Sequence, residues 1–183
     1  MSRSPSVAAV LLASGLALGC SGELDPNPTS PSLSSANTPL ESANQGQQQV
    51  TGSIFINLAD FGGAPQRMSF SAVRHRDGRV TGQFQIFSSQ EPGVRVHGIV
   101  TCLGIDGNLA RLGGVITRSS PPGFESPAFW RVVDNGEGRH APPDLSADLF
   151  PFVPPEIVEE FCAVGFDFPP LIPSPRGNIQ VRP

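Results

Sequence analysis

From Val50 onward, apolar and polar residues alternate along most of the chain, and this period of two predicts half-buried β-strands. In the first run, Val50, Ile54 and Ile56 fall on one face, and in the second Met68 and Phe70 do the same. Turn-forming residues separate the runs. We therefore predict about eight strands, at residues 50–57, 67–75, 79–87, 94–105, 108–118, 127–134, 144–150 and 177–182.

Two Asp-Gly dipeptides lie between neighbouring strands. Asp77-Gly78 follows the second strand and Asp106-Gly107 follows the fourth. A dipeptide of this kind between alternating runs is a strong β-hairpin signal, because its residues tolerate a positive φ. The strands are therefore expected to follow one another as an antiparallel meander.

A meander of this length either closes on itself or leaves two bare edges. We predict an all-β fold in which about eight antiparallel strands close into a small barrel, and a two-sheet β-sandwich is the alternative. Gly82, Gly98 and Gly114 fall on the apolar faces of their strands, where a missing side chain permits the sharp coiling of a barrel.

One short helix is predicted at residues 155–163. Here Ile157, Val158 and Phe161 recur at helical spacing behind Pro155, a residue suited to a first helical turn. The composition agrees with little helix, since 20 Gly and 20 Pro are more than a helical protein would tolerate.

The N-terminus has the pattern of a secretory signal. Residues 7–18 are almost wholly Val, Ala and Leu and follow a single Arg3. This apolar run is shorter than the ~20 residues that cross a bilayer, so a permanent transmembrane helix is the weaker interpretation.

Leu16-Ala17-Leu18-Gly19-Cys20 resembles the lipobox of bacterial lipoproteins. The resemblance implies that Cys20 is diacylated, that the signal is cut before it, and that the protein meets a membrane through this lipid. The segment departs from the usual pattern because Ala17 stands where Leu is favoured. An ordinary signal peptide is the alternative, since Ala17-Leu18-Gly19 also fits a small-x-small cleavage site. Both interpretations predict an extracytoplasmic protein.

The segment after Cys20 is rich in Pro, Ser and Asn and has no aromatic residue, so we predict a disordered tether. As a flexible coil it would span about 30 Å. The predicted organisation is a signal peptide at 1–19, the lipidated cysteine with its tether at 20–49, and a β-domain at 50–183. If Cys20 carries lipid, Cys102 and Cys162 are left as a pair for a disulfide in an oxidising compartment.

Charge and motifs exclude several functions. All 12 basic residues are Arg, against 16 acidic ones, so the chain is mildly acidic and nucleic acid is not expected as a partner. His75, His97 and His140 lack the spacing of a metal site, and His97 is expected to face solvent. Neither G-x-S-x-G nor Cys-x-x-Cys occurs. We therefore predict no catalytic residue, metal or cofactor.

Oxygen ligands gather at 134–138, with Asp144 and Asp148 after them, but without EF-hand spacing, so turn chemistry is the better explanation than calcium. Three phrases of the β-domain are similar to those of secreted bacterial proteins of unknown function, which implies an extracytoplasmic setting and no particular activity. They are His97-Gly98-Ile99-Val100-Thr101-Cys102-Leu103, Gly107-Asn108-Leu109-Ala110 and Val132-Val133-Asp134-Asn135-Gly136-Glu137-Gly138.

Three hypotheses about function follow. The first is a non-enzymatic envelope lipoprotein that binds a small apolar molecule or an envelope component, with Phe70, Phe84, Ile116 and Trp130 lining any pocket, although a packed core is the favoured role of these four. The second is a barrel isomerase or hydrolase, which requires His97 or Asp134 to face inward. The third is a structural protein that meets a protein or polysaccharide through its outer face or through 168–175, which an exposed apolar patch would favour.

Overall fold

The computed structural model describes residues 46–59, 63–88, 93–138 and 140–183. The expected signal peptide, the expected lipid acceptor Cys20 and residues 20–45 of the expected tether lie outside these ranges. Within the described ranges, no helix combines the length and the apolar character needed to cross a membrane.

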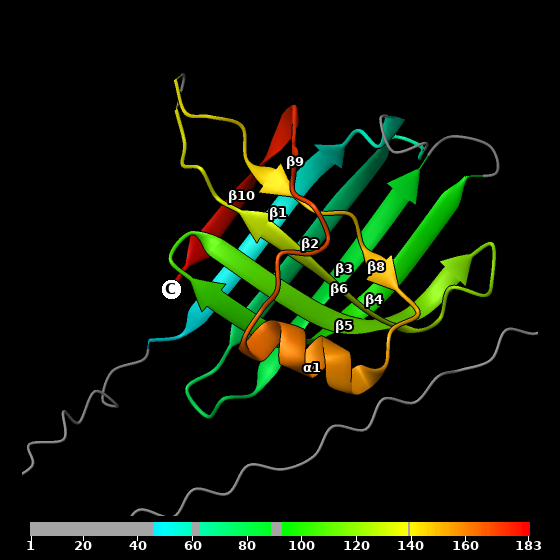
Figure 1. Cartoon of the computed structure of the whole chain (residues 1–183), viewed down its shortest axis with the longest axis horizontal. Helices are drawn as coiled ribbons and strands as arrows, with labels where there is room; N and C mark the ends of the chain where they lie inside the picture. Colours follow the sequence, from blue (N-terminus) through cyan, green and yellow to red (C-terminus); the bar gives the residue numbers. More distant parts are fainter. Residues whose placement is uncertain (1–45, 60–62, 89–92, 139) are drawn as a thin grey trace, which may run out of the picture. The chain divides into compact units, whose positions relative to one another are not determined.

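In the part of the chain that the structure describes, all strands belong to one sheet of ten, which is antiparallel at every pairing and curls into a half-barrel (Figure 1). The strand order is β10-β1-β2-β3-β4-β5-β6-β7-β9, and β8 pairs with β6. This confirms the predicted all-β meander and its single short helix. The elements are β1 (Gln48–Ile56), β2 (Gln66–Arg74), β3 (Val80–Ser88), β4 (Val94–Asp106), β5 (Leu109–Ser120), β6 (Pro127–Val133), β7 (Leu145–Ser146), β8 (Phe150–Pro151), α1 (Pro155–Ala163), β9 (Ile172–Pro173) and β10 (Arg176–Arg182).

Both predicted hairpins are present, but neither has the geometry that Asp-Gly favours, a two-residue loop with a positive φ at both residues. In the first, the backbone N–H of His75 donates to the carbonyl of Arg79, which leaves a three-residue loop with a positive φ at Gly78 only. In the second, Asp106 pairs with Leu109 across a two-residue loop with a positive φ at Gly107 only. Turn type sets strand register, so this difference decides which side chains face each other.

The strand predicted at 144–150 is wrong as one continuous element. The structure has two short strands there, β7 and β8, and both pair with β6. Asp148 interrupts them: its carboxylate accepts a hydrogen bond from the side chain of Gln66 and one from the backbone N–H of Leu149. The sequence also gave no sign of β9, because Pro173 carries no N–H for a ladder.

The curl of the sheet is concentrated in β4 and β5. Their pairing shifts register between His97 and Gly98 and again between Val100 and Cys102. A Cβ on Gly98 would lie 2.6 Å from the carbonyl oxygen of Val115, so the strands approach closely where the side chain is missing. Beyond these bends, β5 and β6 run across β1 to β4 (Figure 1).

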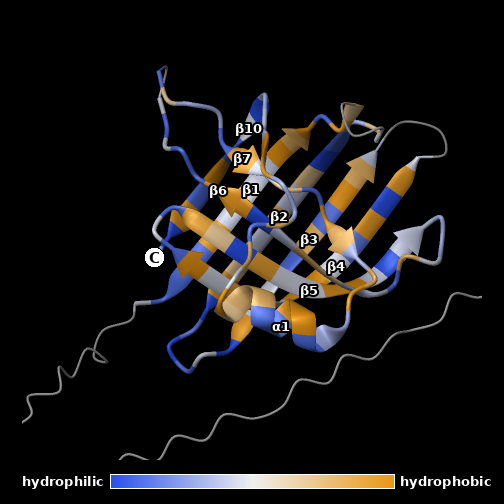
Figure 2. Ribbon diagram, viewed as in Figure 1, coloured by the Kyte–Doolittle hydropathy of each residue, from blue (hydrophilic) through white to orange (hydrophobic). Residues whose placement is uncertain are grey.

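The core fills the space between β1–β4 and the crossing strands β5 and β6. Trp130 of β6 is its largest fully buried side chain. Along β3 and β4, hydrophobic and hydrophilic residues alternate, with one set in the core and the other outside (Figure 2). β6 is instead buried on both faces, because Phe129 on its outer side packs against Val158 and Phe161 of α1.

Cys102 of β4 and Cys162 of α1 form a pair at disulfide distance, with their Cα atoms 6.0 Å apart, which confirms the predicted partners. Gly113 of β5 lies beneath them. A Cβ there would lie 2.6 Å from Sγ of Cys102 and would also meet Val158. Glycine at this position therefore allows the helix to rest close to the sheet.

The free edge of β10 is covered by carboxylates instead of another strand. The backbone N–H of Ile179 donates to Oδ2 of Asp144 at 2.7 Å, and that of Val181 donates to Oδ2 of Asp134 at 2.9 Å. Asp134 follows β6 and Asp144 precedes β7, so these two side chains link the ends of the curled sheet. Such bonds satisfy donors that an edge strand would otherwise leave unpaired.

Candidate functional site

The four residues expected to line any apolar pocket lie together in the packed core. Phe70, Phe84, Ile116 and Trp130 are each at most 5% exposed. The ring of Trp130 has its centroid 4.9 Å from that of Phe84 and 6.1 Å from that of Phe70. The rings therefore fill the interior against one another, which is the packed role that the sequence favoured.

The outer face of β10, β1, β2, β3 and β4, which is the side away from the core, carries an unexpected row of side chains. Residues directly opposite each other on paired strands point to the same face. The register places one residue of each strand in a line that alternates between arginine and phenylalanine. This Arg–Phe ladder consists of Arg176, Phe55, Arg67, Phe87 and Arg95.

The ladder is accessible to solvent. Phe87 is 44% exposed, the three arginines are exposed and Phe55 is half-buried. The guanidinium carbon of Arg95 lies 5.2 Å from the centroid of the Phe87 ring, which is within cation–π range. Neighbouring strands are about 4.8 Å apart, so the five side chains span about 19 Å across the sheet.

Two rows of polar side chains run parallel to the ladder. The nearer row is Asn178, Ser53, Ser69, Gln85 and His97, and the next is Gln180, Thr51, Ser71 and Gln83. Within the nearer row, the hydroxyl oxygens of Ser53 and Ser69 are 3.3 Å apart, at hydrogen-bonding distance. This part of the face therefore offers hydroxyl and amide groups, which both donate and accept hydrogen bonds.

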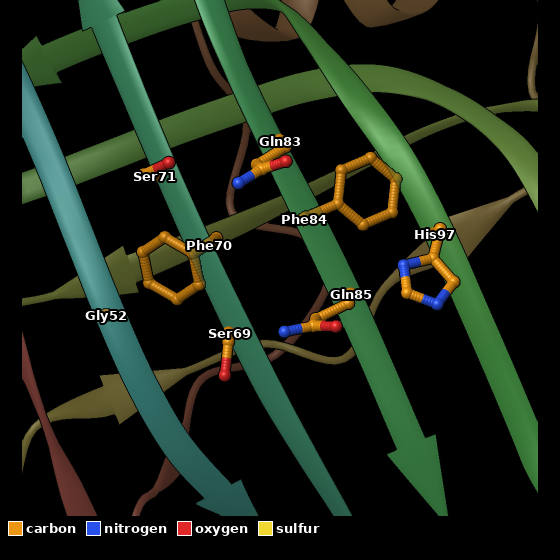
Figure 3. Close-up of a pocket in the computed structure, with 8 residues that line it drawn as sticks. All are labelled: Gly52, Ser69, Phe70, Ser71, Gln83, Phe84, Gln85 and His97. Atoms are coloured by element: carbon orange, nitrogen blue, oxygen red, sulfur yellow. The ribbon is translucent and has the colours of Figure 1, made fainter.

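Hollows in the outer face follow these rows. One of about 220 Å³ is lined by Ser69, Ser71, Gln83, Gln85 and His97 together with Gly52, Phe70 and Phe84 (Figure 3). In the close-up, the polar side chains come from β2, β3 and β4. Two further hollows, of about 470 and 400 Å³, each include Arg67 and Phe87 among their lining residues. The middle of the ladder is thus flanked by recesses on both sides.

The strands that form the outer face carry almost no acidic residues. β1, β2, β3 and β10 contain no acidic residue, and the only one in β4 is its last residue, Asp106. Among the described residues, the ion pairs within 4.0 Å join Arg79 to Asp77 and Arg131 to Asp167. The ladder arginines have no such partner there, although the whole chain carries a net charge of −4. Among the described residues, the strands of this face therefore carry mainly basic charge, although the protein as a whole is acidic.

Glu137 is an acidic group at the β10 border of this face. Its Oε1 accepts hydrogen bonds from the side-chain amides of Gln180 at 2.7 Å and Asn178 at 3.1 Å. These two amides, that of Gln180 first, hold the pKa of Glu137 below its usual range. The carboxylate therefore stays ionised and occupies the β10 end of both polar rows.

Four exposed phenylalanines of the described residues lie on the helix-bearing side of the domain. The phenylalanine patch consists of Phe150, Phe152, Phe166 and Phe168, which are between 38% and 62% exposed. The rings of Phe150 and Phe168 are 4.9 Å apart at their centroids, and those of Phe150 and Phe166 both lie 5.5 Å from Phe129. An exposed patch of this kind is the feature that the surface-interaction hypothesis expects.

The enzyme hypothesis requires His97 or Asp134 to face into the barrel, and the structure places neither side chain there. His97 lies on the outer face, as expected, and Asp134 is bonded to the edge of β10 and to the backbone N–H of Gly136. The carboxylate of Asp144, also considered as an oxygen ligand, is bonded to two backbone amides. In the ranges that the structure describes, no three His, Cys, Asp or Glu side chains come together as a metal site.

The ladder was missed from the sequence because its members lie far apart along the chain. Each occupies a polar-phase position of its strand, where an isolated Arg or Phe normally just meets water. Comparisons with protein-family models, curated proteins and solved structures found no match to this chain.

Proposed function

We propose that this protein is an exported lipoprotein, held at a membrane by lipid on Cys20, and that its β-domain is a non-enzymatic module that binds an anionic envelope component. The observation that carries the proposal is the Arg–Phe ladder on an outer face whose central strands lack acidic residues. A cation-rich face on an acidic protein favours an anionic partner, because its field is local and opposes the net charge.

Export and anchoring are supported by sequence features and by the cysteines. The signal-like residues 7–18 and the lipobox-like segment ending at Cys20 supply the address and the anchor. The pairing of Cys102 with Cys162 fits an oxidising compartment and leaves Cys20 as the one cysteine for lipid. A Pro-, Ser- and Asn-rich segment before β1 would let the module reach partners beyond the headgroups.

Anchoring is tested by expressing the full chain in a bacterium and measuring intact mass and membrane association. We expect a mature form that begins at Cys20, carries acyl chains and sediments with membranes. Cys20→Ser should abolish the acylated mass and release the protein, whereas Ser30→Ala, a matched change in the segment that follows, should alter neither. A mature wild-type protein with no lipid on Cys20 would contradict the anchored part of the proposal.

Anion binding is tested with the natively processed protein and immobilised dextran sulfate, with neutral dextran as the control matrix. We expect retention on the sulfated matrix despite the net negative charge of the protein. Retention should fall as salt rises, because the Debye length shrinks from about 10 Å at 0.1 M to about 3 Å at 1 M. Equal behaviour on both matrices would refute the proposed function.

A further inference from the structure

We propose that the Arg–Phe ladder binds a linear acidic polysaccharide with one carboxylate per disaccharide, laid across the strands from β10 to β4. This inference rests on the proposed function and names the ligand of the same face. Its basis is the alternation of charged and aromatic side chains at a fixed spacing.

The spacing of the ladder matches an alternating polymer. Arg176, Arg67 and Arg95 occupy every second strand, so successive arginines are about 9.6 Å apart across the sheet. Two linked pyranose rings have a similar length. A chain with one carboxylate per disaccharide therefore presents an anionic group to each arginine in turn.

Arginine and phenylalanine suit the two alternating units. The planar guanidinium group can grip a carboxylate with two parallel hydrogen bonds, and an ammonium group cannot do so. The contact between Arg95 and the Phe87 ring restrains one of these guanidinium groups in advance. An exposed phenyl ring offers a flat apolar surface for the C–H face of a neutral pyranose, which Phe87 and, less fully, Phe55 provide.

The polar rows beside the ladder favour a sugar chain over a phosphate polymer. Ser53, Ser69 and Gln85 stand next to the ladder and can both donate and accept hydrogen bonds. Sugar hydroxyls also do both, whereas phosphate oxygens only accept and would leave the acceptor groups of this row unmatched. The 220 Å³ hollow around Gln83 and Gln85 gives such hydroxyls room to enter.

Charge also limits where the chain can lie. Glu137 occupies the β10 end of the polar rows and would repel a carboxylate there. The hollows that share Arg67 and Phe87 flank the middle of the ladder. We therefore expect the strongest binding around β2 and β3, with Arg67 as the central anchor.

The test measures binding of the natively processed full chain in detergent to a hyaluronan oligosaccharide, a glycan with one carboxylate per disaccharide. Carboxyl-reduced hyaluronan, a single-stranded DNA oligomer and vesicles of anionic phospholipid are the comparison probes. Arg67→Gln removes the central arginine. Arg79→Gln removes an equal charge from the hairpin tip and serves as the matched control, because Arg79 is exposed and lies outside the ladder. Phe87→Ser and Phe152→Ser form a second matched pair.

We expect hyaluronan to bind and the reduced glycan to bind at least about tenfold more weakly, since charge-assisted hydrogen bonds are lost. Arg67→Gln and Phe87→Ser should each weaken hyaluronan binding about tenfold or more. Arg79→Gln and Phe152→Ser should change it less than about twofold, because an exposed charge or ring away from the contact contributes little. Unchanged thermal unfolding of these surface variants would show that they still fold.

Three outcomes would overturn the inference, and they separate it from the proposed function. If Arg79→Gln weakens binding as much as Arg67→Gln, the interaction depends on total charge and not on the ladder. If DNA or vesicles bind through Arg67 and hyaluronan does not, the face binds anions but the ligand class is wrong. If none of the anionic probes binds, including dextran sulfate, the proposed function fails together with the inference.

Discussion

Asp144 offers the sharpest test of how the curled sheet is held at its β10 edge. Its carboxylate is buried and accepts two backbone hydrogen bonds, from Asn135 at 2.9 Å and from Ile179 at 2.7 Å. Ile179 is only 1% exposed, so its amide cannot turn to water when the carboxylate is removed. The loss of this acceptor would leave a buried donor unsatisfied.

The size of the effect follows from these two bonds. A hydrogen bond to a charged group contributes about 1.5–3 kcal/mol, and the half-buried amide of Asn135 can regain part of its share from water. We therefore expect Asp144→Ala to lower the free energy of unfolding by about 2–4 kcal/mol. Asp144→Asn, which keeps one acceptor oxygen, should lose about half as much.

Urea unfolding followed by fluorescence is a suitable assay, because Trp130 is the single tryptophan and is fully buried. Asp106→Ala is the matched control. Asp106 is exposed at the end of β4, and its removal should shift the free energy of unfolding by less than about 0.5 kcal/mol. If Asp144→Ala were as mild as this control, the carboxylates would not be holding the edge.

Two further predictions concern the cysteine pair and Asp148. Intact mass under non-reducing conditions should show Cys102 joined to Cys162. The free energy of unfolding of the double Cys→Ala variant should be lower by up to about 4 kcal/mol, the chain-entropy value for a loop of this length. Two free thiols in the native protein would rule out this disulfide. Burial raises the pKa of Asp148 above its unfolded value, against the opposing hydrogen bond from Gln66. The folded state therefore binds this proton more tightly, and stability should fall as the pH rises from the unfolded pKa through the folded pKa. Asp148→Asn should remove that fall and be the more stable protein at neutral pH, as measured by urea midpoints across pH; parallel pH profiles for the two proteins would refute the assignment.

The sequence was sufficient for the elements whose signal is local. The period of two from Val50 onward predicted the main strands, and Pro155 with three apolar residues at helical spacing predicted α1 at the residues where it lies. The cysteine partners followed from counting, because only Cys102 and Cys162 remain once Cys20 is assigned to lipid. These features depend on neighbours in the chain, where period and turn chemistry act directly.

The candidate site depends on register, and register could not be derived from the sequence. The Asp77-Gly78 signal indicated a hairpin, but a two-residue and a three-residue loop place different residues opposite each other. The observed three-residue loop aligns Arg67 with Phe87, and a shift by one would have broken the ladder. The carboxylate cover of β10 was equally hidden, because it joins Asp144 to a strand 35 residues later.

The two sides of the domain differ in the kind of ligand that they would attract. The outer face of β1–β4 and β10 offers arginine, phenyl rings and neutral polar groups. The helix-bearing side offers the phenylalanine patch beside the exposed Glu156, Glu159 and Glu160 of α1. An anionic ligand is attracted to the first surface and repelled by the second.

Amide chemical-shift mapping by NMR, during titration of the natively processed protein with the hyaluronan oligosaccharide, would show which of these two surfaces binds the ligand. We expect the largest shifts on the outer-face residues of β1 to β4, centred on Arg67 and Phe87, and we expect Arg67→Gln to abolish them. Shifts centred on the phenylalanine patch, or no saturable shifts at all, would contradict this expectation.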